Sequence, residues 1–453
     1  MGTATMKRWR HGGWAMAGML AGCALPPPPE GVPAVAAPAA WATLQAEPAA
    51  GRWTGPIDPA LQRLQERAIT VNRDIAQALL RWQEAQRQEQ LAGLSRQPTP
   101  ALDASAGASR SFDPGARLQR SVSLNLGASY EVDLWQRLAH GQEAAAAQAR
   151  AAEADLAAAG VLVRASVAEA WWTLAAIAAQ APSLALQIEG AEQAVALTRL
   201  RVQEGKLLPI EIDKAAATLQ GLRLQAAQQA ELDTRQRLQL GLLLADPAFR
   251  LPDAPALPMQ PSADWRVGET PEQVLARRPD VQQARAGLDA ALQTLRGAEA
   301  ARYPQLRFDL GVGTGGAHWS EWLEHPLARL SSTLLVPMID WRRLDLSRQD
   351  AVGRHELAAL ALRDTMHRAL VEIEQLGAEQ ARLGEEQAAQ ARRLTEARTG
   401  ERLAELRLAV GAISRLDWLQ ARNARLAAEQ ESLQLGLRRL LNAVGLQRAL
   451  VTG

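Results

Sequence analysis

Residues 121–130 read Ser-Val-Ser-Leu-Asn-Leu-Gly-Ala-Ser-Tyr, and their alternation is the first indication of the fold class. Apolar side chains stand at every second position from Val122 to Tyr130, and Ser, Asn or Gly stands between them. Successive side chains of a β-strand point to opposite faces of a sheet, so this period predicts a strand with one apolar and one polar face. The rest of the chain is rich in Ala, Gln, Leu, Arg and Glu, which favour helices. We therefore predict a protein that is mainly α with a small β part.

Three further segments carry the same alternation. Residues 102–108 precede the first stretch and are separated from it by a turn, Phe112-Asp113-Pro114-Gly115. Residues 306–313 alternate in the second half of the chain, and a weaker strand is expected at about 329–337. The sequence thus predicts two hairpins and four strands per chain.

An internal repeat relates the two hairpins. Asp74 and Asp280 each open an amphipathic helix, and they are 206 positions apart (280 − 74). The same offset relates three further landmarks: Trp135-Gln136-Arg137-Leu138 to Trp341-Arg342-Arg343-Leu344, Gly205 to Gly411, and Ile210-Glu211-Ile212 to Leu416-Asp417-Trp418. A constant spacing of this kind predicts two copies of one unit. We expect the first repeat at 56–262 and the second at 263–453, each a helix, a hairpin, a long helix and a helix.

Long helices account for most of each repeat. Residues 134–204 and 341–410 contain almost no Pro or Gly, although Pro182 and a few glycines interrupt the first stretch. A helix of about 70 residues is about 100 Å long at 1.5 Å per residue. The helices expected at 71–97 and 210–245 together match that length, so each repeat provides two parallel tracks suited to the wall of a long tube.

The predicted sheet needs a cover for its apolar face. A soluble half-buried sheet has the same alternation, but no other segment is suited to form a second layer over it. Lipid can cover such a face while water fills the other side. Four strands cannot close a barrel, and an open edge in hydrocarbon leaves backbone groups unpaired. The chain is therefore expected to oligomerise so that several copies share one transmembrane β-barrel.

The N-terminus has the features of a lipoprotein signal peptide. Lys7, Arg8 and Arg10 precede a short apolar run, which ends in Leu20-Ala21-Gly22-Cys23. Cys23 is the only cysteine of the chain, so no internal disulfide is expected. We predict a signal peptide at 1–22, lipidation of Cys23, and a Pro/Ala-rich tether at 23–55.

Composition and motifs argue against an enzyme. The formal net charge of +1 suggests no nucleic-acid partner. The six histidines form no i, i+4 pair of the kind that holds a metal, and no nucleophile motif accompanies them. His318 and His325 are expected in an exposed loop. The stretch 311–316, Gly-Val-Gly-Thr-Gly-Gly, imitates a phosphate loop but is interpreted as the end of a strand. We expect no catalytic residue, no metal site and no cofactor.

Several motifs together resemble the outer membrane factor family, the TolC and OprM group, and in particular its lipidated efflux branch. The motifs are Leu20-Ala21-Gly22-Cys23, Tyr130-Glu131-Val132-Asp133-Leu134-Trp135, Arg277-Arg278-Pro279-Asp280-Val281, Val336-Pro337-Met338-Ile339-Asp340 and Leu416-Asp417-Trp418-Leu419-Gln420-Ala421. The resemblance implies a homotrimer with a 12-stranded β-barrel in the outer membrane and a 12-helix α-barrel that extends into the periplasm. It also implies a periplasmic adaptor and an inner-membrane pump as partners, with the chain as the exit duct of an efflux system.

The resemblance further places a periplasmic gate at the glycine tips. Gly205 and Gly411 break the helices at equivalent places, so the turns 206–209 and 412–414 are expected together at the end of the tube far from the membrane. Family members close their channels there with ion pairs and carboxylate rings. The gate candidates in this chain are Glu211, Arg415, Leu416, Asp417 and Gln420. Gln420 replaces the second carboxylate of the family, and Arg415 is interpreted as the basic partner of Glu211 or Asp417. The alternative is that these are solvated charges at a helix end.

Two other functions are consistent with parts of the pattern. The same duct could serve a type I protein secretion system, but secretion ducts of the family usually lack a lipobox. A purely structural helical lipoprotein would need no alternating strands. The efflux duct is therefore the favoured interpretation, and the identity of the solute is left open because the pump makes most of that choice.

Overall fold

The computed structural model describes residues 37–44, 58–251, 255–258, 268–316 and 326–450. The predicted signal peptide, Cys23, most of the predicted tether, and His318 and His325 lie outside the described residues. The elements in chain order are α2 (Pro59–Val71), α3 (Arg73–Leu94), β1 (Thr99–Ser109), β2 (Gln119–Val132), α4 (Arg137–Gln203), α5 (Ile210–Leu243), α6 (Pro271–Arg277), α7 (Pro279–Ala300), β3 (Gln305–Gly316), β4 (Leu327–Leu335), the 3-10 helix η2 (Pro337–Asp340), α8 (Trp341–Ala409) and α9 (Arg415–Leu450).

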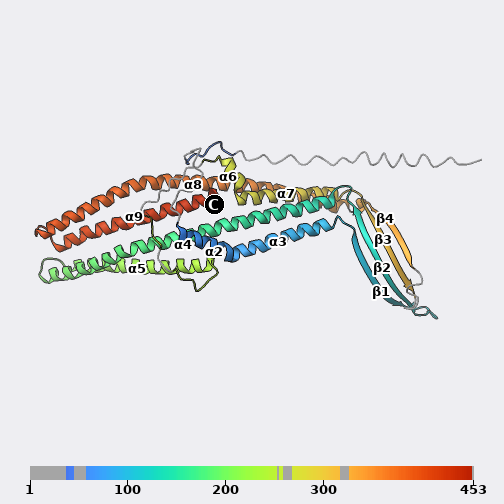
Figure 1. Ribbon diagram of the computed structural model, residues 1–453, viewed down its shortest axis with the longest axis horizontal. Helices are drawn as coiled ribbons and strands as arrows, with labels where there is room; N and C mark the ends of the chain where they lie inside the picture. Colours follow the sequence, from blue (N-terminus) through green and yellow to red (C-terminus); the bar gives the residue numbers. More distant parts are fainter. Residues whose placement is uncertain (1–36, 45–57, 252–254, 259–267, 317–325, 451–453) are drawn as a thin grey trace, which may run out of the picture. The chain divides into compact units, whose positions relative to one another are not determined.

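Long helices lie side by side within residues 36–453, which form one compact unit (Figure 1). The two longest, α4 and α8, have 67 and 69 residues. In the half of the helices that ends in the turns between α4 and α5 and between α8 and α9, α5 packs on α4, α4 packs on α9, and α9 packs on α8. In the half nearer the sheet, the corresponding order is α3, α4, α7 and α8. The prediction of a mainly helical protein with two repeats and a small four-stranded sheet is confirmed.

The offset of 206 residues extends to buried positions. Many equivalent residues are buried in both repeats, among them Ala68 and Val274, Val167 and Ile373, Leu240 and Leu446, and Leu244 and Leu450. It extends to a hydrogen bond as well. The Asn72 side chain donates to the Leu243 carbonyl at 3.0 Å, and Arg278 donates to the equivalent Ala449 carbonyl at 2.9 Å. In both repeats, a hydrogen bond thus joins the start of the helix that precedes the hairpin, α3 or α7, to the end of the last helix, α5 or α9.

The predicted helix boundaries need two corrections. The helix expected at 71–97 begins at Arg73, because the Asn72 side chain caps it by accepting from the Asp74 and Ile75 amides. The short helices α2 and α6, before the hairpin-bound helices, were not predicted. Pro182 lies inside the continuous α4, in agreement with the single long helix that was predicted there.

The four strands form one antiparallel sheet in the order β1-β2-β3-β4. The fourth strand was expected two residues too late, at 329–337, because Pro337 already begins η2. The register joins Leu102 to Leu126 and Leu126 to Val312, so the apolar positions of neighbouring strands fall on one face. Residues at these ladder positions are largely exposed in the single chain. The alternation seen in the sequence therefore becomes one mainly apolar face, in which Thr314 and Ser332 are polar members.

By length and composition alone, helix α4 is long and apolar enough to span a membrane. This was not predicted, because the sequence after Cys23 contains no long uninterrupted apolar run. More than half of the apolar window, 56%, is buried inside the protein. Trp171 and Trp172 of this helix belong to the largest hydrophobic cluster, beside Leu61, Leu240 and Val444. The burial is that of a core helix, and it explains the high hydropathy of α4.

An irregular segment, residues 37–44, packs against the second repeat; we call it the N-terminal strap. The Trp41 indole donates to the Glu269 carbonyl at 2.9 Å. The Ala42 and Thr43 amides donate to the two carboxylate oxygens of Glu374 at 2.7 and 2.9 Å. Trp41 and Leu44 join a buried cluster with Val274, Ile373, Ala443, Leu446, Ala449 and Leu450. Burial alone would raise the pKa of Glu374, but the hydrogen bonds from the strap outweigh it and lower this pKa.

Candidate functional sites: the helical tips and the two faces of the sheet

Both helical tips close with the same backbone motif. Gly205 and Gly411 have φ of 73° and 74°, a region that glycine adopts without steric cost. The Lys206 amide donates to the Arg201 carbonyl at 2.8 Å, and the Ala412 amide donates to the Arg407 carbonyl at 2.8 Å. These are Schellman bonds, which satisfy carbonyls at a helix end. The two predicted tip glycines thus have identical roles, and both turns lie at the end of the helices far from the sheet (Figure 1).

Asp417 is bound to its own helix end. The Ser414 amide and hydroxyl donate to its Oδ2 at 2.9 and 2.7 Å, and the Asp417 amide donates back to the Ser414 hydroxyl at 3.3 Å. This reciprocal pair is a capping box at the start of α9. The hydrogen bonds from Ser414 hold the pKa of Asp417 below its usual value of 3.8, and Arg201 lowers it further. Asp417 is therefore a charged carboxylate with a structural role of its own.

The equivalent carboxylate, Glu211, has different partners. Its Oε1 accepts a salt bridge from Lys214 at 2.8 Å, one turn along α5. Leu208 stands where the second repeat has Ser414, so Glu211 takes part in no capping box. Lys206, in the turn itself, pairs with Glu204 at 2.8 Å. The two repeats thus present one carboxylate each at the tip, but Asp417 is held by hydrogen bonds from Ser414, whereas Glu211 is held by an ion pair with Lys214.

Arg415 is not the partner of either carboxylate within the chain, and that interpretation of the sequence is corrected here. Its guanidinium lies over the Trp418 ring, 4.1 Å from the centroid, and Arg422 approaches the same ring at 5.4 Å. A cation over an indole face is attracted by the ring quadrupole. Arg415 also donates to Gln193 of α4 at 3.5 Å. The arginine thereby links the start of α9 to α4.

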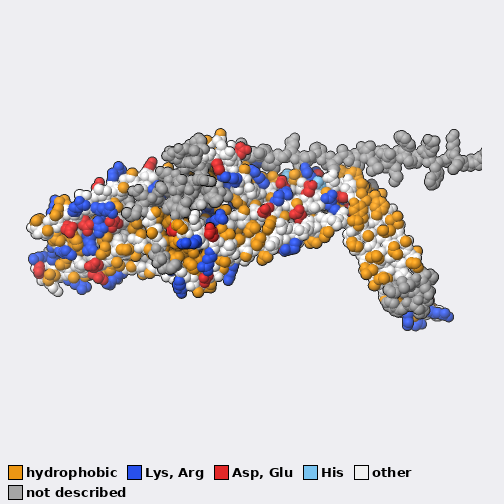
Figure 2. Space-filling view, viewed as in Figure 1, with side chains coloured by type: hydrophobic (Ala, Val, Ile, Leu, Met, Phe, Trp, Pro, Cys, Tyr) orange, Lys and Arg blue, Asp and Glu red, His pale blue; other side chains and the backbone are white. Residues whose placement is uncertain are grey.

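The last two gate candidates are on the same first turns of α9. Leu416 is half-buried, and Gln420 is exposed. Gln420 lies three residues after Asp417 and therefore shares a helix face with it. Figure 2 shows Lys, Arg, Asp and Glu side chains gathered over this end of the helices.

The sheet offers two chemically different faces. Ladder neighbours on the polar face include Asp103, Asn125, Ser129, Glu131, Arg307, Asp309 and Arg329, while Leu310 faces Ala128 and Leu330 on the other. Arg307 donates to Ser129 at 2.6 Å and pairs with Asp309 at 3.1 Å. Leu327 and Leu335, at the two ends of β4, are the exceptions on the polar face. One face therefore suits hydrocarbon and the other suits water, and hydrophobic side chains cover much of the visible sheet in Figure 2.

The glycines of 311–316 are part of a strand, as the sequence predicted. All six residues belong to β3. A Cβ added at Gly313 would overlap the Asn125 side chain, and one at Gly315 would lie 2.9 Å from the Val122 carbonyl oxygen. The glycines thus allow neighbouring strands to approach on the polar face, and they form no phosphate loop.

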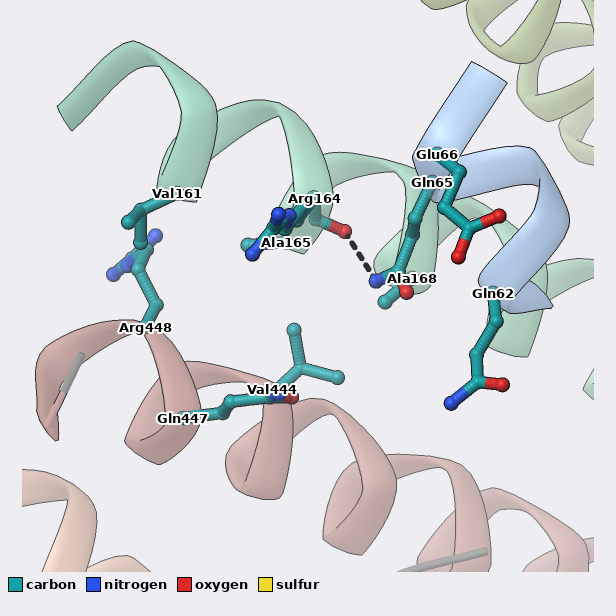
Figure 3. A pocket seen from close by; sticks show the side chains of 10 residues that line it. All are labelled: Gln62, Gln65, Glu66, Val161, Arg164, Ala165, Ala168, Val444, Gln447 and Arg448. Carbon is teal, nitrogen blue, oxygen red and sulfur yellow. Dashed lines mark hydrogen bonds between the residues drawn. The ribbon is translucent and has the colours of Figure 1, made fainter. Parts of the chain in front are cut away.

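A cavity of about 500 Å³ lies between α2, α4 and α9 (Figure 3). Gln65 donates to the Arg164 carbonyl at 3.0 Å on one wall, and Ala168 and Val444 line the floor. Its polar groups are amides and guanidinium groups with one carboxylate, Glu66. Among the described residues there is no group of three or more His, Cys, Asp or Glu side chains able to hold a metal ion.

Sequence reasoning missed two structural sites. Arg278 is buried and pairs with Asp280 at 2.8 Å and Glu372 at 2.9 Å. Burial would lower its pKa, but these two carboxylates outweigh it and raise the pKa. The N-terminal strap was also missed. One sequence feature could have pointed to the strap. The second repeat has Gly377 where the first repeat has Trp171, and a Cβ at Gly377 would overlap Thr43 and Leu44 of the strap.

Comparisons with known proteins agree with this geometry. The family model described as "Outer membrane efflux protein" matches residues 64–245 and 270–451. The pyoverdine export outer membrane protein OpmQ of Pseudomonas putida is 27% identical over 454 residues, which cover 96% of this chain and 95% of OpmQ. The cation efflux system protein CusC of Escherichia coli K12 is 24% identical over 400 residues, which cover 88% of this chain and 87% of CusC. The open-state MtrE outer membrane channel of Neisseria gonorrhoeae has the same fold, with a TM-score of 0.84 at 24% identity, covering 94% of this chain and 98% of MtrE. The family resemblance read from the sequence is confirmed: the chain belongs to the outer membrane efflux protein family.

Proposed function

We propose that this chain is one protomer of the outer-membrane exit duct of a tripartite efflux system, which passes small solutes from an inner-membrane pump and a periplasmic adaptor to the exterior. The observation that carries this proposal is the sheet. It has one apolar face, one polar face and two open edges, and it stands at the end of helices about 100 Å long. A sheet of this kind fits a bilayer, and helices of this length fit a passage through the periplasm.

The two open edges support a shared barrel. β1 and β4 are the edge strands, and in the antiparallel order they run in opposite directions. The β4 strand of one copy can therefore continue into the β1 strand of the next without changing the antiparallel pattern. An unpaired edge in hydrocarbon costs several kcal/mol per backbone group. Three copies would give 12 strands, which is the homotrimer expected from the family.

Reconstitution tests the duct directly. Protein extracted from outer membranes in mild detergent should be an oligomer by light scattering and should form stable ion-conducting pores in planar bilayers. A well-folded single chain by light scattering, or an oligomer that leaves bilayers without conductance, would contradict the proposal.

Efflux is favoured over protein secretion as the use of the duct. The relatives that cover most of this chain are named for the export of pyoverdine and the efflux of cations, toluene or antibiotics. Deletion of the gene should therefore raise sensitivity to small toxic solutes. A deletion that changed the secreted protein profile and no solute sensitivity would favour the secretion duct.

We also propose that Cys23 carries lipid and supplies a second anchor to the outer membrane. The lipobox residues Leu20-Ala21-Gly22-Cys23 support this assignment. Cys23→Ser should abolish labelling with radioactive palmitate while part of the protein still inserts, because the strands also hold it in the membrane. Unchanged labelling of the variant would contradict lipidation.

The gate is proposed at the tips. Glu211 and Asp417 place one carboxylate from each repeat in the first turn of the helix that follows the tip. In a closed ring of copies each carboxylate is repeated around the axis. A small electrostatic contribution of one protomer to closing the tip is therefore summed over all protomers. Arg415 supports the ring through Trp418 and Gln193, with Leu416 and Gln420 beside it.

A further inference from the structure

The β1–β2 hairpin projects beyond the rest of the described sheet. β1 and β2 remain paired as far as Ser109 and Gln119, whereas the pairing of β2 with β3 ends at Val122 and Gly316. The other end of β2 leads into α4, so the hairpin lies at the end of the sheet away from the helices (Figure 1). Residues 317–325, between β3 and β4, are outside the described residues and form no part of the site argued below.

Three arginines surround this hairpin, and we call them the arginine rim. Arg110 follows β1, Arg117 precedes β2 and Arg120 belongs to β2, and all three are exposed. None of them forms an ion pair with a described residue. The one carboxylate of residues 107–121, Asp113, accepts a hydrogen bond from a serine hydroxyl of the turn at 2.5 Å. The hairpin therefore carries an excess of positive charge, and Figure 2 shows basic side chains at this end of the sheet.

Arginines at the opposite end of the sheet have carboxylate partners. Arg137 pairs with Glu131 at 2.8 Å, and Arg307 pairs with Asp309 at 3.1 Å. A carboxylate at this distance occupies the donors of a guanidinium group and offsets its charge. The arginine rim differs from these pairs, because its donors are left for an anion from outside the chain.

The arginine rim lies at the boundary of the apolar face. Arg120 is six positions before Leu126 and therefore points to the same face (126 − 120). Ten positions separate it from Tyr130 (130 − 120), which is about 33 Å along a strand. A strand tilt of about 40° reduces this to about 25 Å, the height of the apolar band of a transmembrane barrel. Tyr130 pairs with Phe308, and aromatic residues of this kind mark a membrane boundary. Arg120 thus reaches the headgroups at the opposite, outer boundary.

We infer that the arginine rim binds phosphate groups of the phosphorylated glycolipid in the outer leaflet. This site rests on the proposed duct, and it adds a lipid partner that the passage of solutes does not itself require. A guanidinium group can hold a phosphate through two parallel hydrogen bonds. The place of Arg120 on the lipid-facing side favours a lipid phosphate over a soluble anion. Phe112 and Leu118 of the same hairpin are exposed and provide an apolar contact beside the charges.

Lipid binding by the purified oligomer tests the site. The probe is lipid A that retains its phosphates, titrated into the full chain in a neutral detergent, with the bound lipid counted by native mass spectrometry. The test variant combines Arg110→Gln, Arg117→Gln and Arg120→Gln. A basic side chain near an anionic headgroup layer contributes about fivefold to affinity, so the variant should bind lipid A weaker by about tenfold or more.

Two controls accompany this variant. The first removes the same charge from exposed arginines of the helices, in the combination Arg235→Gln, Arg354→Gln and Arg368→Gln, and should bind lipid A like the parent protein. The second uses the parent protein with lipid A from which the phosphates have been removed, and this lipid should bind about as weakly as lipid A binds to the rim variant. Conductance in planar bilayers shows that each variant is assembled.

The outcomes separate the lipid site from the duct. Equal binding of lipid A by the parent and by a conducting rim variant would overturn the site. Equal binding of the two lipids by the parent would reduce the site to an apolar contact, and displacement of lipid A by an equal concentration of inorganic phosphate would make it a small-anion site. The proposed duct stands in all three cases. If the parent protein is a single chain that forms no pore, the duct fails and the lipid site fails with it.

Discussion

Among the described residues, three helix C-termini end in a left-handed residue, and only at α5 is that residue not glycine. Ala245 has a φ of 51°, and the Asp246 amide donates to the Gly241 carbonyl at 2.8 Å in the same Schellman pattern as at the two tips. The left-handed conformation costs a residue with a Cβ about 1–2 kcal/mol. The site therefore retains strain that the glycine tips avoid.

Replacing this alanine should stabilise the protein. Ala245→Gly relieves the strain but increases the entropy of the unfolded chain, so we expect a net gain of about 0.5–1 kcal/mol in the free energy of unfolding. Gly411→Ala, the reverse change at an equivalent motif, should lower it by a similar amount. Denaturant titration followed by far-UV circular dichroism measures both. A loss of stability in Ala245→Gly would contradict this account.

Asp417 allows its charge and its capping role to be separated. Asp417→Asn keeps an oxygen that can accept from Ser414, whereas Asp417→Ala removes the carboxylate half of the capping box at a cost of about 1 kcal/mol. If the charge closes the tip, both variants raise single-channel conductance in planar bilayers. If only the cap matters, Asp417→Ala alone does so. Equal, unchanged conductance in both would remove Asp417 from the gate.

The pH dependence of the tip follows from the same bonds. The pKa of Asp417 is lowered from 3.8, so the stabilising contribution of its carboxylate is present above that value. The contribution is lost as the pH falls through the lower, folded pKa. Conductance of the parent channel should therefore rise only under acidic conditions below about pH 4, and Asp417→Asn should abolish this part of the rise.

At the residue scale, the sequence indicated some partners and concealed others. The Ser-x-x-Asp spacing of Ser414 and Asp417 is a recognisable capping box, so this bond could have been predicted. The stacking of Arg415 on Trp418 was also within reach of helix geometry, because the two are three residues apart. The bond from Arg415 to Gln193 spans 222 positions and depends on how α4 packs against α9.

At the scale of elements, periodicity decided what was predictable. Strands with a period of two and helices with few Pro or Gly were found near their observed ends, because burial imposes those patterns on the sequence. The break at Asn72 was missed, since one asparagine both ends α2 and caps α3. The N-terminal strap was missed because it has no regular structure and its hydrogen bonds reach about 330 positions along the chain.

A glycine pair on α8 tests the packing of the strap. A Cβ at Gly377 would overlap Thr43 and lie 2.9 Å from Leu44 Cγ, whereas a Cβ at Gly384 meets nothing within 4 Å. Gly384→Ala should therefore stabilise the helix by up to about 1 kcal/mol. Gly377→Ala should instead displace the strap.

Limited proteolysis measures the displacement. We expect faster cleavage near residues 37–44 in Gly377→Ala and no such change in Gly384→Ala. Identical behaviour of the two variants would show that the strap does not depend on the space left by Gly377.

At the scale of the whole molecule, the repeat explains why one chain is incomplete. The two repeats bury a shared set of positions, so each repeat has a core of its own. Contacts between the repeats are made through α4, which packs against α7 and α9. The sequence could predict that one chain is too few, because four strands leave two edges. It could not specify the number of copies, which depends on the angle between protomers.

The last prediction tests which face of the sheet meets lipid. Leu330 and Ser331 are neighbours on β4, but Leu330 pairs with Leu310 on the apolar face and Ser331 pairs with Asp309 on the polar face. An arginine on a lipid-facing position near the bilayer centre costs about 2–4 kcal/mol, whereas lumen positions accept charge. Leu330→Arg should therefore lower the folding yield in lipid vesicles at least tenfold, and Ser331→Arg should fold normally and change the ion selectivity of the pore. Because the two substitutions introduce the same side chain one residue apart, general effects of charge and size cancel. Normal folding of Leu330→Arg together with failure of Ser331→Arg would mean that the polar face is the one turned to the membrane, and the proposed barrel would be wrong.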